Sequence, residues 1–157
     1  MQSMNAEIIE YKPEHQPWFE KLNRAWIEKD FYMEPRDVDV LQQPEANIIS
    51  TGGRILMATI EREIAGTVAL MYVSPGVFEF TKMAVAEKFR GKKVGEALAH
   101  AGLREARQLG ARKIILYSNT LLAPAIALYR KIGFKEIPLD GPYKRSNIKM
   151  ELELKNS

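Results

Sequence analysis

Apolar and polar residues alternate most cleanly at the end of the chain. Every second position from Ile148 to Leu154 is apolar, and the positions between them are charged. This is the period of a half-buried strand. Further apolar runs predict strands at residues 7–12, 54–60, 64–73, 77–85, 113–117 and 134–137. Short polar turns separate the runs between residues 54 and 85, so we expect these three to form an antiparallel meander.

Three segments have the period of a helix. The first carries Trp18, Leu22, Ala25 and Trp26 at i, i+4, i+7 and i+8, a stripe that predicts core packing rather than a ligand site. The other two span residues 94–109 and 124–132, and a glycine follows each of them, as is common after a helix end.

The segment from residue 31 to residue 50 lacks such a period. Pro35 and Pro44 interrupt it, so we expect irregular structure, within which Asp37 would cap a short helix through Leu41. A chain of 157 residues fits one domain. The order of elements therefore predicts a single α+β domain over residues 1–157.

The composition argues against several classes of protein and of site. The chain has no cysteine and two histidines that lie far apart, His15 and His100, so we expect no disulfide, no cysteine nucleophile and no metal site. No apolar stretch approaches the roughly 18 residues of a membrane span, and the first residues lack the pattern of a secretory signal. These observations predict a cytoplasmic protein without a membrane partner.

A cluster of cations stands where the helix at 94–109 is expected to begin. Residues 88–95 read Lys-Phe-Arg-Gly-Lys-Lys-Val-Gly, and cations are unfavourable at the positive end of a helix dipole. A bound anion would reverse this cost by meeting the unpaired N–H groups of the first turn, and Gly91 and Gly95 would let those groups approach a phosphate. The alternative is a solvated basic turn. Neither a Walker pattern nor G-x-G-x-x-G is present, so nucleotide hydrolase and dinucleotide sites are not supported.

Three segments in order resemble the GCN5-related N-acetyltransferase (GNAT) family. Residues 90–95 resemble its Arg/Gln-x-x-Gly-x-Gly/Ala pyrophosphate loop, residues 80–85 its fourth strand, and residues 125–134 its A-x-x-L-Y-x-x-x-G-F signature. The resemblance implies a mostly antiparallel, twisted central sheet of about seven strands flanked by about four helices. It also implies that acetyl-CoA is the cosubstrate and that the acetyl group passes directly to an amine.

The resemblance further implies which residues bind the cofactor. The backbone of strand 83–85 would hold the pantetheine arm, and the loop would cradle the pyrophosphate. Two positions depart from the family pattern. Lys93 replaces the first loop glycine, which a negative φ would tolerate, and Leu122 replaces an asparagine whose role Asn119 would take over. The implied cofactor-binding residues are Met83, Ala84, Val85, Arg90, Gly91, Lys92, Lys93, Val94, Gly95, Asn119 and Tyr129.

Two residues are candidates for acid–base chemistry. By resemblance, Tyr129 would protonate the departing thiolate, and the alternative is a tyrosine ring packed in the core. Glu79 lies four residues before Met83, and strand alternation would place Glu79, Thr81 and Met83 on one face. Histone-acetylating members have a glutamate base at this position, and flanking phenylalanines would raise the Glu79 pKa by desolvation. The alternative is a solvent-facing strand glutamate.

Candidate acceptor-binding residues come from two loops. Phe31, Tyr32 and Glu34 combine aromatic and acidic groups that suit a cationic amine, and Arg145 would pair with a carboxylate. Together they would suit an amino-acid-like or peptide amine. The alternative is that these loops are charged for solubility alone.

Two other function classes stay open. A non-catalytic acyl-CoA-binding module would keep the loop but show no turnover. A nucleic-acid binder would use the cations of residues 88–93, but a net charge of +3 is too small to indicate nucleic acid by itself. We expect a monomer or homodimer that acts on a small-molecule or peptide amine, without a nucleic-acid partner.

Overall fold

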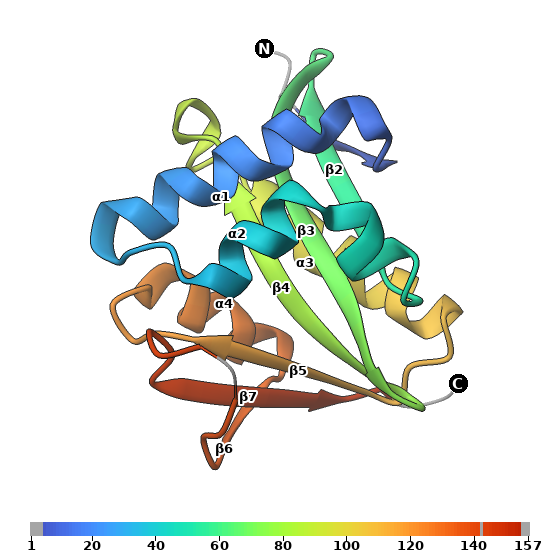
Figure 1. The fold of residues 1–157 in the computed structure, drawn as a ribbon, viewed down its shortest axis with the longest axis vertical. Coiled ribbons are helices and arrows are strands. Elements are labelled where there is room, and N and C mark those ends of the chain that lie inside the picture. Colours follow the sequence, from blue (N-terminus) through green and yellow to red (C-terminus); the bar gives the residue numbers. More distant parts are fainter. Residues whose placement is uncertain (1–4, 142, 155–157) are drawn as a thin grey trace.

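Seven strands form one open sheet in the order β1-β2-β3-β4-β5-β7-β6 (Figure 1). The computed structural model describes residues 5–141 and 143–154. Neighbouring strands are antiparallel except β4 and β5, whose parallel pairing is limited to Val77–Glu79 against Lys113–Ile115. This confirms the predicted mostly antiparallel α+β sheet. The strands are β1 (Glu7–Glu10), β2 (Arg54–Ile60), β3 (Glu63–Ser74), β4 (Val77–Val85), β5 (Lys113–Ser118), β6 (Lys135–Ile137) and β7 (Ile148–Glu153).

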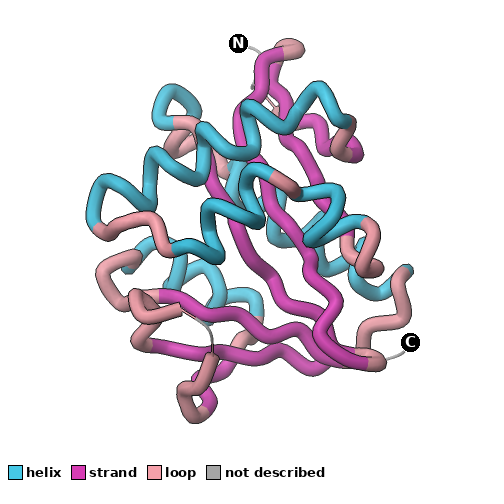
Figure 2. Tube along the Cα trace, viewed as in Figure 1, coloured by secondary structure: helices cyan, strands magenta, loops and turns pink. Residues whose placement is uncertain are grey.

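Four helices cover the two faces of the sheet (Figure 2). On one face α1 (Gln16–Asp30) and α2 (Pro35–Gln42) pack with Ile55 and Met57 of β2. On the other face α3 (Val94–Gln108) and α4 (Ala123–Ile132) pack with Leu56 and Ala58 of the same strand. β2 is therefore a continuous apolar run because both of its faces are buried. In the described parts of the chain, no helix is long and apolar enough to cross a membrane.

The buried stripe of α1 lies one position away from the predicted one. Phe19, Asn23 and Ile27 are buried, whereas Trp18 is 45% exposed. The Asn23 side chain donates to the Phe19 carbonyl at 2.9 Å and accepts a bond from the Trp26 indole at 2.9 Å. The predicted stripe is wrong because an asparagine is expected on the surface. Here the two hydrogen bonds satisfy the polar atoms of the Asn23 side chain, so it can be buried.

The segment from residue 31 to residue 50 contains the predicted short helix, but it is more helical than expected. It contains α2 and a π-helical turn, η2 (Glu45–Ile49). Pro35 starts α2 because a proline at the first helical position loses no hydrogen bond. Asp37 is not the cap: Glu34 is the N-cap residue, and the Asp37 carboxylate accepts a bond from the Glu34 amide at 2.9 Å.

Candidate active site

A bulge in β4 decides which side chains reach each face. The pairing of β3 with β4 shifts between Thr67 and Ala69, and Lys82, beside the shift, has a φ of 54°. The extra residue interrupts the strand alternation. Met83 packs against the α3–α4 core, whereas Lys82 bonds to Asp37 of α2 on the opposite face. The predicted common face for Glu79, Thr81 and Met83 is therefore wrong.

β4 and β5 separate beyond their short parallel pairing and border a cavity of about 760 Å³. Residues 80–85 line it from β4 and residues 116–119 from the end of β5. Within the described ranges, no strand pairs with the β5-facing edge of β4 past Glu79. The backbone N–H and C=O groups of this edge are therefore available to an extended ligand.

The basic loop and the start of α3 form one end of this cavity. No side chain from the described residues caps α3, so its first N–H groups and its positive dipole end remain available. Gly91 has a φ of 79°, and a Cβ placed there would meet nothing within 4 Å. The predicted loop residues that line the cavity are Arg90, Gly91, Lys93, Val94 and Gly95; Lys92 does not line it.

Lys93 adopts a left-handed backbone, with φ 62° and ψ 24°. The condition for tolerating a lysine here, a negative φ, is not met: the loop has a backbone suited to glycine although the residue is lysine. A non-glycine residue in this region costs about 1–2 kcal/mol. The residue with the strained backbone is therefore also a cation on the cavity wall.

Gly95 has room for a side chain in the protein alone. A Cβ there would lie 3.8 Å from Val85 and 3.9 Å from Leu128, which are ordinary contacts. Internal packing therefore does not require glycine at this position, and close approach of a ligand to the backbone remains as a reason for it.

Tyr129 lies on the cavity wall between two aromatic rings. It is 7% exposed, and its ring meets those of Phe80 and Phe134 edge-on at centroid distances of 6.2 and 5.7 Å. Burial raises the pKa of its hydroxyl far above the usual value of a tyrosine. No hydrogen bond or charge from the described residues contributes to this shift, so the hydroxyl is available to a ligand.

Glu79 is buried and does not line the cavity. Burial raises the pKa of its carboxyl group, against the opposing effect of Lys82 and Arg36. The side chain of the neighbouring Thr81, which does line the cavity, also acts to lower this pKa. Glu79 therefore lies behind the cavity wall.

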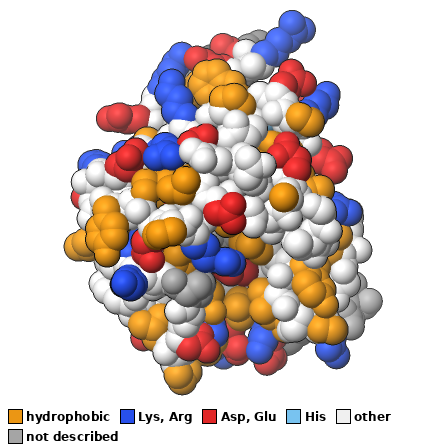
Figure 3. Space-filling model, viewed as in Figure 1, with side chains coloured by type: hydrophobic (Ala, Val, Ile, Leu, Met, Phe, Trp, Pro, Cys, Tyr) orange, Lys and Arg blue, Asp and Glu red, His pale blue; other side chains and the backbone are white. Residues whose placement is uncertain are grey.

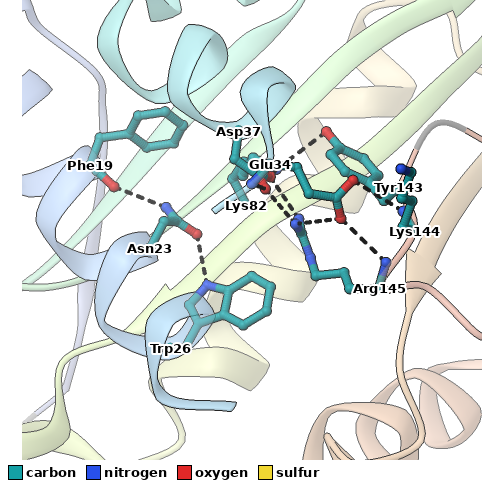
Figure 4. A network of polar contacts seen from close by, with 9 residues as sticks. All are labelled: Phe19, Asn23, Trp26, Glu34, Asp37, Lys82, Tyr143, Lys144 and Arg145. Carbon is teal, nitrogen blue, oxygen red and sulfur yellow. Dashed lines mark hydrogen bonds and ion pairs between the residues drawn. The ribbon is translucent and has the colours of Figure 1, made fainter. Parts of the chain in front are cut away.

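A buried ionic network, drawn in Figure 4, adjoins the cavity, and its members Lys82, Tyr143 and Arg145 line the wall. Asp37 accepts bonds from Lys82 Nζ at 2.9 Å and from Arg145 Nη2 at 2.7 Å. Lys82 also donates to the Tyr143 hydroxyl at 3.2 Å. Glu34 accepts the backbone amides of Lys144 and Arg145 at 3.1 and 3.2 Å. These contacts hold the β6–β7 loop against α2.

Only some of the predicted acceptor-binding residues line the cavity. Phe31 and Arg145 line the cavity, whereas Tyr32 is 67% exposed and does not. Glu34 is buried behind Arg145 and does not line it either. Asn119 lines the cavity, but its side chain already donates to the Arg145 carbonyl at 2.6 Å. It would have to exchange this bond to hold a pantetheine arm.

Lys82 is the functional candidate that sequence reasoning missed. It is 4% exposed although it belongs to a strand of otherwise mostly apolar residues. A charged residue inside such a run is the signal that could have revealed it, because a buried lysine is nearly always paired. Among residues 5–141 and 143–154, no group of three or more acidic or histidine side chains could hold a metal ion.

Comparisons with known proteins identify the fold and the family. The chain matches the model of the acetyltransferase (GNAT) family over residues 13–134. A GNAT-family acetyltransferase from Staphylococcus aureus has a TM-score of 0.87 at 21% identity, covering 96% of this chain and 100% of that one. The PaiA N-acetyltransferase of Thermoplasma acidophilum, solved with coenzyme A, has a TM-score of 0.77 at 19% identity, covering 96% and 100%.

Curated relatives match mainly a part of the chain. The mycothiol acetyltransferase of Corynebacterium aurimucosum is 31% identical over 134 residues, which are 83% of this chain and 40% of that protein. That of Saccharomonospora viridis is 45% identical over 58 residues, or 37% and 19%. The chain thus spans less than half the length of these relatives. The family match covers most of the chain and agrees with the motifs and the fold, so this protein belongs to the acetyltransferase (GNAT) family.

Proposed function

We propose that this protein transfers an acetyl group from acetyl-CoA to a primary amine of a small molecule or peptide. One observation carries the proposal: the uncapped start of α3, with its cations and glycines, opens onto the same cavity as the unpaired edge of β4. An anion-binding helix end beside an exposed strand edge suits a long ligand with a phosphorylated end. The name mycothiol acetyltransferase, borne by the curated relatives, supports a small-molecule acceptor.

The residues present suit acetyl-CoA along the length of the cavity. Arg90, Lys93 and the first amides of α3 would bind the pyrophosphate. The backbone of residues 83–85 would bond the pantetheine arm as an added strand does, and would direct an N–H at the thioester oxygen. A fixed donor at a developing oxyanion contributes about 2.7–4 kcal/mol in comparable sites.

Bound acetyl-CoA supplies an activated acetyl group as a thioester. The acceptor nitrogen forms a bond to the acetyl carbon as the carbon–sulfur bond breaks, and the nitrogen must lose a proton. Tyr129 Oη would donate its proton to the leaving sulfur. Its raised pKa keeps the hydroxyl protonated across the physiological range, so this donor is always in the required state.

Glu79 would take the amine proton indirectly. Because it does not line the cavity, the proton would have to reach it by way of the Thr81 hydroxyl, which belongs to a residue of the cavity wall. Its raised pKa brings this carboxyl group nearer to the working pH, as a general base requires.

Replacing Glu79 by glutamine is expected to flatten the acidic limb of the pH–rate profile. The wild-type limb should lie above the usual glutamate range, because burial raises the Glu79 pKa. Initial rates of free-thiol release between pH 5 and 9 would measure it. A variant with the same profile as the wild type would show that Glu79 is not the base.

Replacing Gly95 by alanine is expected to weaken acetyl-CoA binding by about tenfold or more without loss of stability. The new Cβ has room within the protein, but it would separate the helix amides from the pyrophosphate. Thermal unfolding tests both points. Acetyl-CoA at 100 times its Kd should stabilise the wild type by about 2.7 kcal/mol, and the same concentration should stabilise the variant less.

Gln108→Ala is the control, because it changes an exposed residue at the far end of the same helix. It should respond to acetyl-CoA like the wild type. A Gly95→Ala protein with unchanged acetyl-CoA affinity would contradict the placement of the pyrophosphate. Binding without thiol release on any amine would favour the non-catalytic module.

A further inference from the structure

The guanidinium of Arg145 has one side that the protein leaves available. Arginine has five N–H donors in a fixed plane. Nη1 is directed at both Asp37 and Glu34, and one Nη2 donor is directed at Asp37. The remaining two donors, on Nε and Nη2, lie on the same edge. No acceptor within residues 5–141 and 143–154 bonds to Nε.

Neighbouring rings fix the orientation of this edge. The Arg145 Cζ lies 4.6 Å from the Tyr143 ring centroid and 5.5 Å from that of Trp26. All three residues line the cavity. The side chain of Arg145 is 10% exposed, so its plane is held at the cavity wall by stacking and ion pairing. A donor pair held in this way loses little entropy when it binds an anion.

The charges around the cavity favour an anionic group. Among the described residues, the one acidic side chain on the wall is Asp30. The carboxylates that neutralise Arg145 and Lys82 stand behind the wall, since neither Glu34 nor Asp37 lines it. The basic residues on the wall are Lys29, Lys82, Arg90, Lys93 and Arg145.

The basic loop and Arg145 belong to opposite faces of the sheet. The basic loop leads into α3, which packs on one face of the sheet, whereas Arg145 is bonded to α2 on the other. On the face viewed in Figure 3, cationic and anionic side chains are interspersed over the surface, so a cation-rich wall is a feature of the cavity rather than of that surface.

We propose that the acceptor carries a carboxylate, which the Nε–Nη2 edge of Arg145 binds in a two-point contact. The acceptor is then an amino acid or a similar small amino-carboxylate. This inference rests on the proposed function. Asp37 and Lys82 are positioning residues: Asp37 holds the adjacent Nη1–Nη2 edge of the guanidinium, and Lys82 bonds to Asp37.

The first test needs no variant. Thiol release is measured with acetyl-CoA and pairs of acceptors that differ only in a carboxylate or a carboxamide. The wild type should prefer the carboxylate by about 10- to 100-fold in kcat/KM, the range for an ionic hydrogen bond. The amine of the carboxamide is less basic, which by itself favours the opposite preference.

Arg145→Lys is the second test, because it keeps the positive charge but lacks the planar pair of donors. The preference for the carboxylate should fall below about threefold, mainly through KM, while acetyl-CoA affinity stays near the wild-type value. Lys144→Gln is the control, because it removes a charge from an exposed side chain next in sequence. It should keep the preference.

Equal rates on both members of each pair would overturn the inference but leave the proposed function intact. A carboxylate preference that survives in Arg145→Lys would also overturn it. Absence of thiol release on every amine, despite binding of acetyl-CoA, would overturn the proposed function instead.

Discussion

Replacing Asp37 by asparagine is expected to lower the free energy of unfolding by about 3–5 kcal/mol at neutral pH, the usual cost of removing one partner from a buried ion pair. Asp37 is 0% exposed and bonds to both Lys82 and Arg145. Asparagine preserves the shape but not the charge, so two buried cations would lose their central partner. Urea denaturation at pH 7 would measure the difference.

The pH dependence of stability gives a second measurement of the same residue. Burial alone would raise the Asp37 pKa, but hydrogen bonds and charges from Arg145 and Lys82 outweigh it and lower the pKa from 3.8 to about 2. A lowered pKa stabilises the folded state above the unfolded value, and this stability is lost as pH falls from about 4 towards 2. Its size is about 2 kcal/mol at most. The Asp37→Asn protein should lack this part of the acid dependence.

Asp39→Asn provides a matched control, because Asp39 is an exposed aspartate of the same helix. It should change the free energy of unfolding by about 0.5 kcal/mol or less. If both variants unfolded at the same urea concentration as the wild type, the network would not stabilise the fold.

The elements that depend on local pattern could be predicted from the sequence. β7 alternates because one of its faces packs on the core, and α3 ends where Gly110 follows. The start of α2 could not, because a proline stops a helix in the middle but is tolerated at its first position, and the sequence does not say which applies to Pro35. The buried face of α1 could not be predicted either, because hydrogen bonds within the helix allow Asn23 to be buried.

The candidate site also has one part that could be predicted from the sequence and one part that could not. Its proposed anion-binding end is continuous in the sequence, so residues 90–95 could be predicted as a unit. The network around Arg145 joins the start of α2, the bulge of β4 and the β6–β7 loop, which meet only in the folded chain. The bulge also places the Met83 side chain on the opposite face of the sheet from that of Glu79. No local sequence pattern indicates where an extra residue enters a strand.

Replacing Tyr129 by phenylalanine is expected to lower kcat by about 100-fold, the scale of a lost general acid. The contacts of the ring with Phe80 and Phe134 remain, so unfolding and the KM for acetyl-CoA should change little. The measurement is steady-state thiol release together with thermal unfolding. Tyr72→Phe is the control, because Tyr72 is a 43% exposed tyrosine of β3 that also meets a phenylalanine ring edge-on. Turnover of Tyr129→Phe equal to that of Tyr72→Phe would mean that the Tyr129 ring serves packing alone, because the only atom removed is the hydroxyl oxygen that faces the cavity.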